Sequence, residues 1–263
     1  MHLRRRQKQK HNTHFAGRGV ICMLISLILL GGNGAPSKIS DTSGAFRVKL
    51  TSSSCDTPPD VQPVSAAEID TGDTSKPVIA VTFDAGGPSE PTAHILDVLA
   101  KHNVHSTFFI TGDWANKNPD LLRRIRNEGH ELGNHTMHHP DLRSLSDQAL
   151  CTELSQAEQV VSSIAGASTR PYFRPPYGGR DDRVRTLAAQ LGYRTVYWTI
   201  DTLDWQTTAT PDSISKIVMA HINNGVIILM HAGSQAESEN LDGLMAKIEQ
   251  MNYQMVTVTQ LLQ

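Results

Sequence analysis

The stretch Pro77-Val-Ile-Ala-Val-Thr-Phe-Asp-Ala-Gly86 decides the fold of this chain. Its first part, from Pro77 to Phe83, is a near-continuous apolar run, which is typical of strands buried on both faces of a parallel sheet. The run ends in one carboxylate, Asp84, which is followed by Ala85 and a glycine. The stretch therefore predicts a buried strand that delivers Asp84 to a loop.

Apolar strands and amphipathic helices alternate from this stretch to the C-terminus. Strict alternation implies parallel strands with right-handed crossovers, and about seven strands favour a distorted (β/α)7-type barrel within the α/β class. The predicted strands are 77–83, 106–111, 131–133, 171–174, 195–199, 225–230 and 254–258. The predicted helices are 89–100, 119–128, 146–164, 181–191, 241–251 and one that begins at Thr210. No strand is followed by G-x-G-x-x-G, so a dinucleotide site is not expected.

The region before the barrel divides into two parts. Residues 1–35 have a basic start, an apolar run at 20–30 and a small-residue exit, which predicts a signal peptide or an N-terminal membrane anchor. The apolar run is shorter than the roughly 20 residues that span a bilayer, which favours export over a membrane tether. Residues 36–76 are rich in Ser, Thr, Asp, Gly and Pro and predict a flexible arm, and 77–263 form the folded domain.

Composition excludes one class of function and leaves the redox state open. The net charge of -2 and the pI of about 6.6 argue against a nucleic-acid partner. Proteins that bind nucleic acids usually have a concentrated basic face on the folded domain. Cys55 and Cys151 can pair in an exported protein, but two free thiols fit the sequence equally well. Nothing in the sequence indicates the oligomeric state. We expect a secreted protein, or one anchored to the outer side of a membrane.

Polar residues follow the predicted strands at one end of the barrel, where barrels of this type carry their chemistry. Each residue alone is a weak signal, since a single Asp after a strand is usually a turn residue or a helix cap. Their arrival in register at one rim is a stronger signal. The rim residues are Asp84, His135, Arg174, Asp201 with Asp204, and His231.

The segment Asn134-His-Thr-Met-His-His139 predicts a metal site. His135 and His139 are four positions apart, so one helical turn would place both imidazoles on one face. That spacing is a common way to hold a divalent metal, and two imidazoles with oxygen donors suit zinc, cobalt or nickel. A solvated His-rich turn is the alternative interpretation.

An acid and a base can be assigned among the other rim residues. His231 ends the most apolar strand, and a neighbouring carboxylate such as Asp204 would raise its pKa for general acid catalysis. Arg174 precedes two prolines and can hold Asp84 ionised as the base. Buried core histidines and surface arginines are the ordinary alternatives.

A small pocket beside these groups completes a hydrolytic site. Trp205 and Leu229 are predicted to wall an apolar pocket, although both residue types more often serve as core. The backbone N–H of Tyr177 is predicted to stabilise an oxyanion. With a metal that lowers the pKa of water towards roughly 7, this arrangement suits hydrolysis of an amide or ester.

Five motifs in order resemble those of the NodB-homology polysaccharide deacetylases, the fourth family of carbohydrate esterases. The likeness runs from about Pro77 to the C-terminus. The motifs are Thr82-Phe-Asp-Ala-Gly86, His135-Thr-Met-His-His139, Arg174-Pro-Pro-Tyr177, Asp201-Thr-Leu-Asp-Trp205 and Leu229-Met-His231.

The resemblance implies metal-dependent removal of N- or O-acetyl groups from a polysaccharide, with peptidoglycan or another N-acetylglucosamine polymer as the first expectation. The roles that it implies for the individual residues agree with those predicted from their positions at the rim. The base is Asp84, the metal ligands are His135 and His139, the acid is His231 tuned by Asp204, the residue that orients the base is Arg174, the oxyanion donor is Tyr177, and the acetyl pocket is Trp205 with Leu229.

Ala85 departs from the family pattern, in which a second Asp at this position is the third metal ligand. A methyl group cannot coordinate a metal, so three outcomes are open. Asp84 or extra water completes the metal shell, another carboxylate such as Asp113 or Glu90 reaches in, or the chain is a glycan-binding module that has lost its metal. We expect the first outcome and a working enzyme, because every other catalytic position is intact.

Overall fold

One parallel sheet of eight strands forms the centre of the part of the chain that the structure describes, which is Cys55 and residues 57–263. The structure is a computed structural model. The strands are β1 (Val78–Ala85), β2 (Thr107–Ile110), β3 (Glu131–Asn134), β4 (Tyr172–Phe173), β5 (Arg194–Thr195), β6 (Ile200–Asp201), β7 (Ile227–His231) and β8 (Gln254–Val256). Their order is β5-β4-β3-β2-β1-β7-β6, and β8 pairs with β1.

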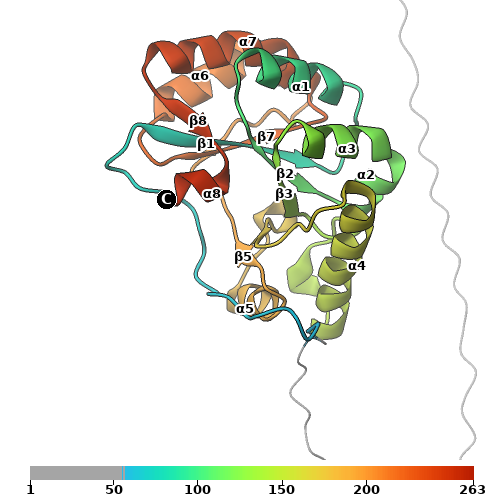
Figure 1. Cartoon of the computed structure of the whole chain (residues 1–263). Coiled ribbons are helices and arrows are strands. Elements are labelled where there is room, and N and C mark those ends of the chain that lie inside the picture. The colour runs from blue at the N-terminus through green and yellow to red at the C-terminus, as the bar shows by residue number, and fades with distance from the viewer. Residues whose placement is uncertain (1–54, 56) are drawn as a thin grey trace, which may run out of the picture. The chain divides into compact units, whose positions relative to one another are not determined.

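Helices cover the outer face of this curled sheet, except for the last one, which lies on the opposite side of β1 and packs with side chains such as Ala80 and Ile227 (Figure 1). They are α1 (Thr92–Lys101), α2 (Gly112–Lys117), α3 (Pro119–Asn127), α4 (Asp147–Ala165), α5 (Asp182–Gln190), α6 (Pro211–His221), α7 (Gln235–Gln250) and α8 (Val258–Leu261). Short 3₁₀ turns occur at Leu142–Ser144 and Pro176–Gly178. Because β5 and β6 end the strand order without pairing to each other, the barrel is incomplete, and the predicted distorted (β/α)7-type barrel is confirmed.

The opening stretch forms the central strand. β1 is buried along nearly its whole length and pairs in parallel with β2, β7 and β8. Its odd-numbered side chains, such as Val81 and Phe83, pack in the main apolar core, while Ala80 belongs to a separate cluster with Phe109 and Ile227. This two-sided burial explains why the strand has no polar alternation before Asp84.

Local signals place most helix starts correctly. The Ser146 side chain accepts a hydrogen bond from the Ala149 amide at the start of α4, and the Asp181 carboxylate caps α5. Thr210 forms a capping box ahead of Pro211, the first residue of α6. A side-chain acceptor at the N-cap satisfies an amide that has no partner within the helix, so these positions are readable from sequence.

Several predicted boundaries are wrong. Of the strand predicted over 195–199, only Thr195 lies in a named strand, β5, while Val196 forms an isolated bridge with Ile69 and β6 begins at Ile200. The helix predicted from Leu241 begins at Gln235, since the Ser234 side chain caps it by accepting from the Glu237 amide. The sequence patterns do not predict α2 and α8 as helices.

Residues 57–76, called here the docked segment, pack against the barrel although the sequence predicts a flexible arm. The Thr57 hydroxyl donates to the Gln190 carbonyl, and the Val64 amide donates to the Ala189 carbonyl at the end of α5. Figure 1 shows this segment passing α5 before it enters β1. Cys55 and Cys151 form a disulfide that joins the start of this region to α4. The boundary at residue 76 stays a prediction.

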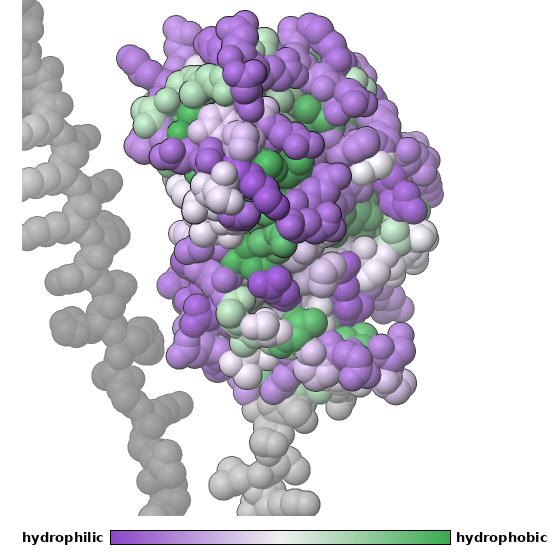
Figure 2. Space-filling model, turned by 60° about the vertical axis from the view of Figure 1, so that its left-hand side comes forward, coloured by the Kyte–Doolittle hydropathy of each residue, from purple (hydrophilic) through white to green (hydrophobic). Residues whose placement is uncertain are grey.

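The predicted signal or anchor, residues 1–35, and the first part of the predicted arm lie outside the described residues. Among the residues that are described, no helix is long and apolar enough to cross a membrane. The surface face in Figure 2 is mostly hydrophilic, with hydrophobic residues in separate areas. In the part of the chain that the structure describes, the large hydrophobic side chains that are exposed are Tyr177, Leu203, Trp205 and Met251.

Candidate active site

A pocket of about 610 Å³, called here the rim pocket, opens at the C-terminal ends of the strands. Eight of the predicted rim and site residues line it, and Arg174 and Asp204 lie directly behind two of them. The lining residues predicted from sequence are Asp84, His135, His139, Tyr177, Asp201, Trp205, Leu229 and His231. Residues spread over much of the chain therefore meet at one site.

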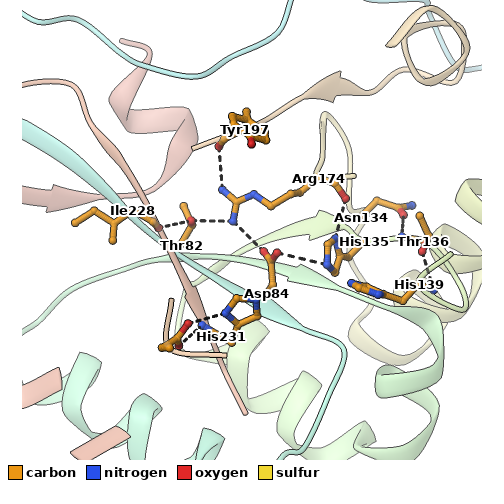
Figure 3. A network of polar contacts seen from close by, with 11 residues as sticks. Thr82, Asp84, Asn134, His135, Thr136, His139, Arg174, Tyr197, Ile228 and His231 are labelled. Atoms are coloured by element: carbon orange, nitrogen blue, oxygen red, sulfur yellow. Dashed lines mark hydrogen bonds and ion pairs between the residues drawn. The ribbon is translucent and has the colours of Figure 1, made fainter. Parts of the chain in front are cut away.

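Asp84 is held by a buried arginine. Arg174, which has no exposed surface, donates from Nη1 to Asp84 Oδ1 at 2.8 Å and to the Thr82 hydroxyl at 2.9 Å. Its Nη2 donates to the Tyr197 carbonyl at 3.2 Å. Figure 3 shows Asp84 lying between Arg174, His135 and His231. The pairing that the sequence predicts for Arg174 is present in this geometry.

The charges around Asp84 keep it ionised. Burial raises the pKa of this carboxyl, but the charge of Arg174, with smaller electrostatic contributions from His135 and His231, lowers it further, so the net pKa lies below the ordinary value. A depressed pKa means that this pairing stabilises the fold above the pKa of the unfolded chain, and the stabilisation is lost as the pH falls through the folded pKa.

His135 and His139 meet, although not through the helical turn that the spacing suggests. Thr136 and His139 have positive φ values of 70° and 62°, so the chain forms a tight loop after β3. The two imidazole centroids are 4.8 Å apart. The helical interpretation is wrong for this backbone, because the Asn134 side chain accepts from the Thr136 amide and supports the turn.

The tautomer of His135 is suited to a metal ligand. Its Nδ1 lies 2.7 Å from the Arg174 carbonyl oxygen, which can only accept, so Nδ1 carries the proton and Nε2 keeps its lone pair. That Nε2 lies 3.4 Å from Asp84 Oδ2. Burial lowers the pKa of His135, and burial followed by the charge of His135 lowers the pKa of His139 to about 4, so both rings are neutral near pH 7.

The donor set fits a divalent transition metal in part. The neutral imidazoles of His135 and His139 and the carboxylate of Asp84 line the same pocket, and zinc accepts donors of this kind. Ala85 supplies no donor, and neither Asp113 nor Glu90 lines the rim pocket. Within the described residues, no group of three or more His, Cys, Asp or Glu side chains is arranged ready to hold a metal.

His231 and Asp204 form a second polar pair on the other side of Asp84. His231 Nδ1 lies 2.7 Å from Asp204 Oδ1, and the His231 amide donates to Asp204 Oδ2 at 2.8 Å. The Asp204 side chain is fully buried, while that of His231 is 29% exposed. Because both carboxylate oxygens are engaged, the imidazole has a fixed orientation and its Nε2 is left for the pocket.

The pKa of His231 is raised. Burial lowers the pKa of this ring, but the hydrogen bond and charge of Asp204, and then the charges of Asp84 and Asp201, outweigh burial. His231 therefore stays protonated to a higher pH than an ordinary histidine. This is the protonation state that a general acid needs.

Asp204→Asn should lower the pKa of His231, because the substitution removes the charge and the strongest acceptor of the ring proton. The midpoint of a His231 imidazole NMR titration should move to lower pH. Asp201→Asn is the matched control, since Asp201 acts on His231 only through a smaller charge effect and should shift the midpoint less. An unchanged midpoint in Asp204→Asn would contradict this account of the pair.

Tyr177 and Trp205 stand at the mouth of the rim pocket and Leu229 lies inside it. Tyr177 is 73% exposed and Trp205 is 60% exposed, so a long polymer can reach both rings from solvent. Leu229 is 3% exposed and supplies an apolar wall. Tyr177 has a φ of 56°, an uncommon conformation for a residue other than glycine.

Sequence reasoning misses Trp198, which also lines the rim pocket. The pattern places it in a regular strand, and its Tyr-Trp pair is the signal that points to a stacked wall. Thr82 is likewise expected only as a strand residue, yet its hydroxyl donates to the Ile228 carbonyl and accepts from Arg174. Its polar side chain inside an apolar run is the available clue.

Comparison with known proteins identifies the family. Residues 71–196 match the family model described as polysaccharide deacetylase. The peptidoglycan-N-acetylmuramic acid deacetylase PdaA of Bacillus subtilis is 33% identical over 175 residues, which cover 65% of this chain and 66% of the relative. The chain spans 52%, 62% and 66% of the length of three curated relatives that it matches.

Solved structures agree with this match. The solved structure of Bacillus subtilis PdaA, a family 4 carbohydrate esterase, has a TM-score of 0.71 at 32% identity, and the match covers 74% of this chain and 85% of that one. A family 4 pseudoenzyme from Bacillus anthracis has a TM-score of 0.73 at 30% identity, and covers 76% of this chain and 70% of that one. The chain belongs to the polysaccharide deacetylases of carbohydrate esterase family 4, as its five motifs predict.

Proposed function

We propose that this chain is a metal-dependent deacetylase that removes N-acetyl groups from peptidoglycan or another N-acetylglucosamine polymer. The observation that carries the proposal is the meeting of Asp84, His135, His139 and His231 around one pocket open to solvent. Removal of O-acetyl groups by the same site is a variant of this proposal. The names of relatives support an N-acetylated glycan, since they include peptidoglycan and chitooligosaccharide deacetylases.

His135 and His139 would hold the metal, with Asp84 as the oxygen donor nearest to them. Zinc is the first candidate, and cobalt or nickel suits the same donors. The bound metal would polarise the acetyl carbonyl and lower the pKa of a water molecule. The chain's own contribution here is to keep both imidazoles neutral and to fix the His135 tautomer through the Arg174 carbonyl.

Asp84 and His231 move the protons in the proposed reaction. Asp84, kept ionised by Arg174, accepts a proton from the attacking water. His231, kept protonated by Asp204, donates a proton to the departing sugar nitrogen. Water therefore adds to the acetyl carbon, the carbon–nitrogen bond breaks, and the products are acetate and an amino sugar.

Tyr177, Trp205 and Leu229 would position the acetyl group. The Tyr177 amide would donate to the developing oxyanion, which is where a preorganised donor lowers the barrier most. Leu229 and Trp205 would contact the methyl group of the acetyl. The exposed Tyr177 and Trp205 rings are also available to a long glycan.

A glycan-binding module without metal is the second candidate, and Ala85 is the observation that favours it. The related pseudoenzyme from Bacillus anthracis indicates that members of this family lose activity, and a mutant of that pseudoenzyme has restored enzymatic activity. We favour the enzyme, because both proton-transfer pairs are complete in this chain.

Acetate release tests the two candidates. Purified protein with added zinc or cobalt is offered chitin oligomers, peptidoglycan and acetylated xylan, and acetate is measured for each. Release from an N-acetylated glycan supports the proposal and identifies the substrate. Binding of a glycan without release from any polymer favours the module.

His135→Ala should remove most of the bound zinc. With one imidazole lost from a set of three donors, metal content after dialysis should fall by roughly tenfold or more. His138→Ala is the matched control, since this neighbouring imidazole pairs with Glu153 and is absent from the pocket lining. Equal metal content in wild type and His135→Ala would remove the two-histidine site from consideration.

Export is part of the proposal. The Cys55–Cys151 disulfide supports an oxidising compartment outside the cytoplasm, in agreement with the predicted signal or anchor at residues 1–35. The protein would then be secreted or tethered on the outer side of a membrane, where a cell-wall glycan is accessible.

A further inference from the structure

The docked segment pairs with the open edge of the sheet at β5 and with the chain that leads into β7. The Ile69 amide donates to the Thr195 carbonyl at 2.9 Å, and the Tyr197 amide donates to the Ile69 carbonyl at 2.7 Å. Further along, the Gly72 amide donates to the Gly225 carbonyl at 2.8 Å. Ile69 is 3% exposed and belongs to a buried core cluster. The segment is therefore bonded to the strands as part of the barrel wall.

One ion pair connects this segment to the loop beyond Tyr177. Arg180 donates from Nε and Nη2 to the two carboxylate oxygens of Glu68, at 2.5 and 2.9 Å. Only 16% of the Glu68 side chain and 27% of the Arg180 side chain is exposed. Arg180 Nη1 also donates to the Gly178 carbonyl at 3.2 Å. Such a two-pronged pair fixes the plane of the guanidinium.

The guanidinium plane of Arg180 supports an aromatic stack that reaches the rim pocket. Its central carbon lies 3.4 Å from the centroid of the Tyr197 ring. The Tyr197 and Trp198 rings stack with centroids 3.9 Å apart and an angle of 19° between their planes. Trp198 lines the rim pocket, and the Tyr197 carbonyl accepts from the Arg174 guanidinium that holds Asp84.

We propose that Glu68 and Arg180 are positioning residues that set the Tyr197–Trp198 wall of the glycan site. The role of that wall in glycan binding rests on the proposed function. Neither residue lines the pocket, so each acts through the stack. The family match begins at residue 71, and Glu68 lies before it in the segment that the sequence predicts to be an arm.

Glu68→Gln and Arg180→Met should weaken binding more than they slow the chemical step. For an N-acetylglucosamine tetramer, KM should rise by roughly tenfold with kcat nearly unchanged, because the Trp198 ring is displaced while Arg174 keeps its hydrogen bonds to Asp84 and Thr82. Arg180→Lys should recover only part of this loss, since an ammonium keeps the charge but neither forms the two-pronged pair nor stacks on Tyr197.

Near-UV circular dichroism measures the packing of the stacked Tyr197 and Trp198 rings and does not require enzymatic activity. Glu68→Gln and Arg180→Met should weaken the Tyr–Trp signal, and all spectra are recorded below the melting temperature of each variant. Asp182→Asn is the control, because it breaks an exposed ion pair with Arg185 that belongs to α5 and leaves the stack alone.

The two readouts separate this inference from the proposed function. Wild-type spectra and wild-type KM in both Glu68→Gln and Arg180→Met would overturn the positioning role. If the wild type neither hydrolyses nor binds the tetramer, the proposed function fails, and the circular dichroism of the variants still decides whether Glu68 and Arg180 hold the stack. A variant that changes the spectrum but keeps the wild-type KM also overturns the role in the glycan site.

Discussion

We expect Asp84→Asn to abolish acetate release, because removal of the base should lower the rate by about 10²–10⁴-fold or more. The substitution also removes the one carboxylate that pairs with the buried Arg174 guanidinium. An uncompensated buried charge of this kind costs about 3–5 kcal/mol of folding free energy. The variant should therefore be both inactive and less stable, as measured by acetate release and by urea unfolding.

A second substitution separates the two effects of Asp84→Asn. In Asp84→Asn with Arg174→Met, the buried charge is gone, so part of the lost stability should return while activity stays absent. Recovery of stability without recovery of activity would assign the loss of rate to the base. Acetate release by Asp84→Asn at close to the wild-type rate would contradict the role of Asp84.

Ala85→Asp should tighten zinc binding and raise the rate of acetate release. It adds a carboxylate directly after Asp84, at the position where the family pattern has a second Asp. We expect zinc affinity to rise by at least about tenfold. Residues that only support a metal ligand already contribute about 10–100-fold to metal affinity, so a direct ligand should contribute no less. Chelator competition measures the affinity.

Stability gives a second view of Ala85→Asp. Ala85 is 1% exposed and packs in the apolar core, so a carboxylate there should lower the melting temperature when metal is removed. Added zinc should reverse this loss by binding the folded state. Ala85→Asn has the same shape without the charge and should gain less zinc affinity. If Ala85→Asp binds zinc as weakly as the wild type, position 85 does not limit the site.

The sequence predicts the barrel because its strongest signals are local. The apolar run of β1, the Ser146 and Asp181 caps and the Pro211 helix start each act within a few residues, so they can be read without tertiary contacts. The docked segment could not be predicted in this way. Its polar composition is typical of a linker, and its order depends on bonds from Ile69 to strand residues more than a hundred positions away.

The site residues also differ in whether local sequence signals predict them or whether their positions depend on tertiary contacts. Asp84 and His231 are predictable because both end buried strands that pair in register, which brings their Cα atoms opposite each other. The sequence predicts that His135 and His139 lie close together, but it predicts a helical turn between them. The structure has a tight loop instead, in which the Asn134 side chain accepts a hydrogen bond from the Thr136 amide. Trp198 is missed because its place in the pocket wall depends on stacking with Tyr197 and not on strand alternation.

Asp84 lies where it can act both as the base and as an oxygen donor to the metal. It pairs with Arg174 through one carboxylate oxygen, while the other lies 3.4 Å from His135 Nε2. In the family pattern with a second Asp, the resemblance implies that one carboxylate serves as ligand and the other as base. With Ala85 in that position, Asp84 is the carboxylate that lies next to His135, which is why the two substitutions above carry the largest expected effects.

The most direct measurement is the yield of acetate and of free amine from an N-acetylglucosamine tetramer, with zinc-loaded wild type compared with Asp84→Asn. The account predicts equal amounts of both products from the wild type and none above background from the variant. Full zinc loading of the wild type without either product, or equal yields from both proteins, would contradict it.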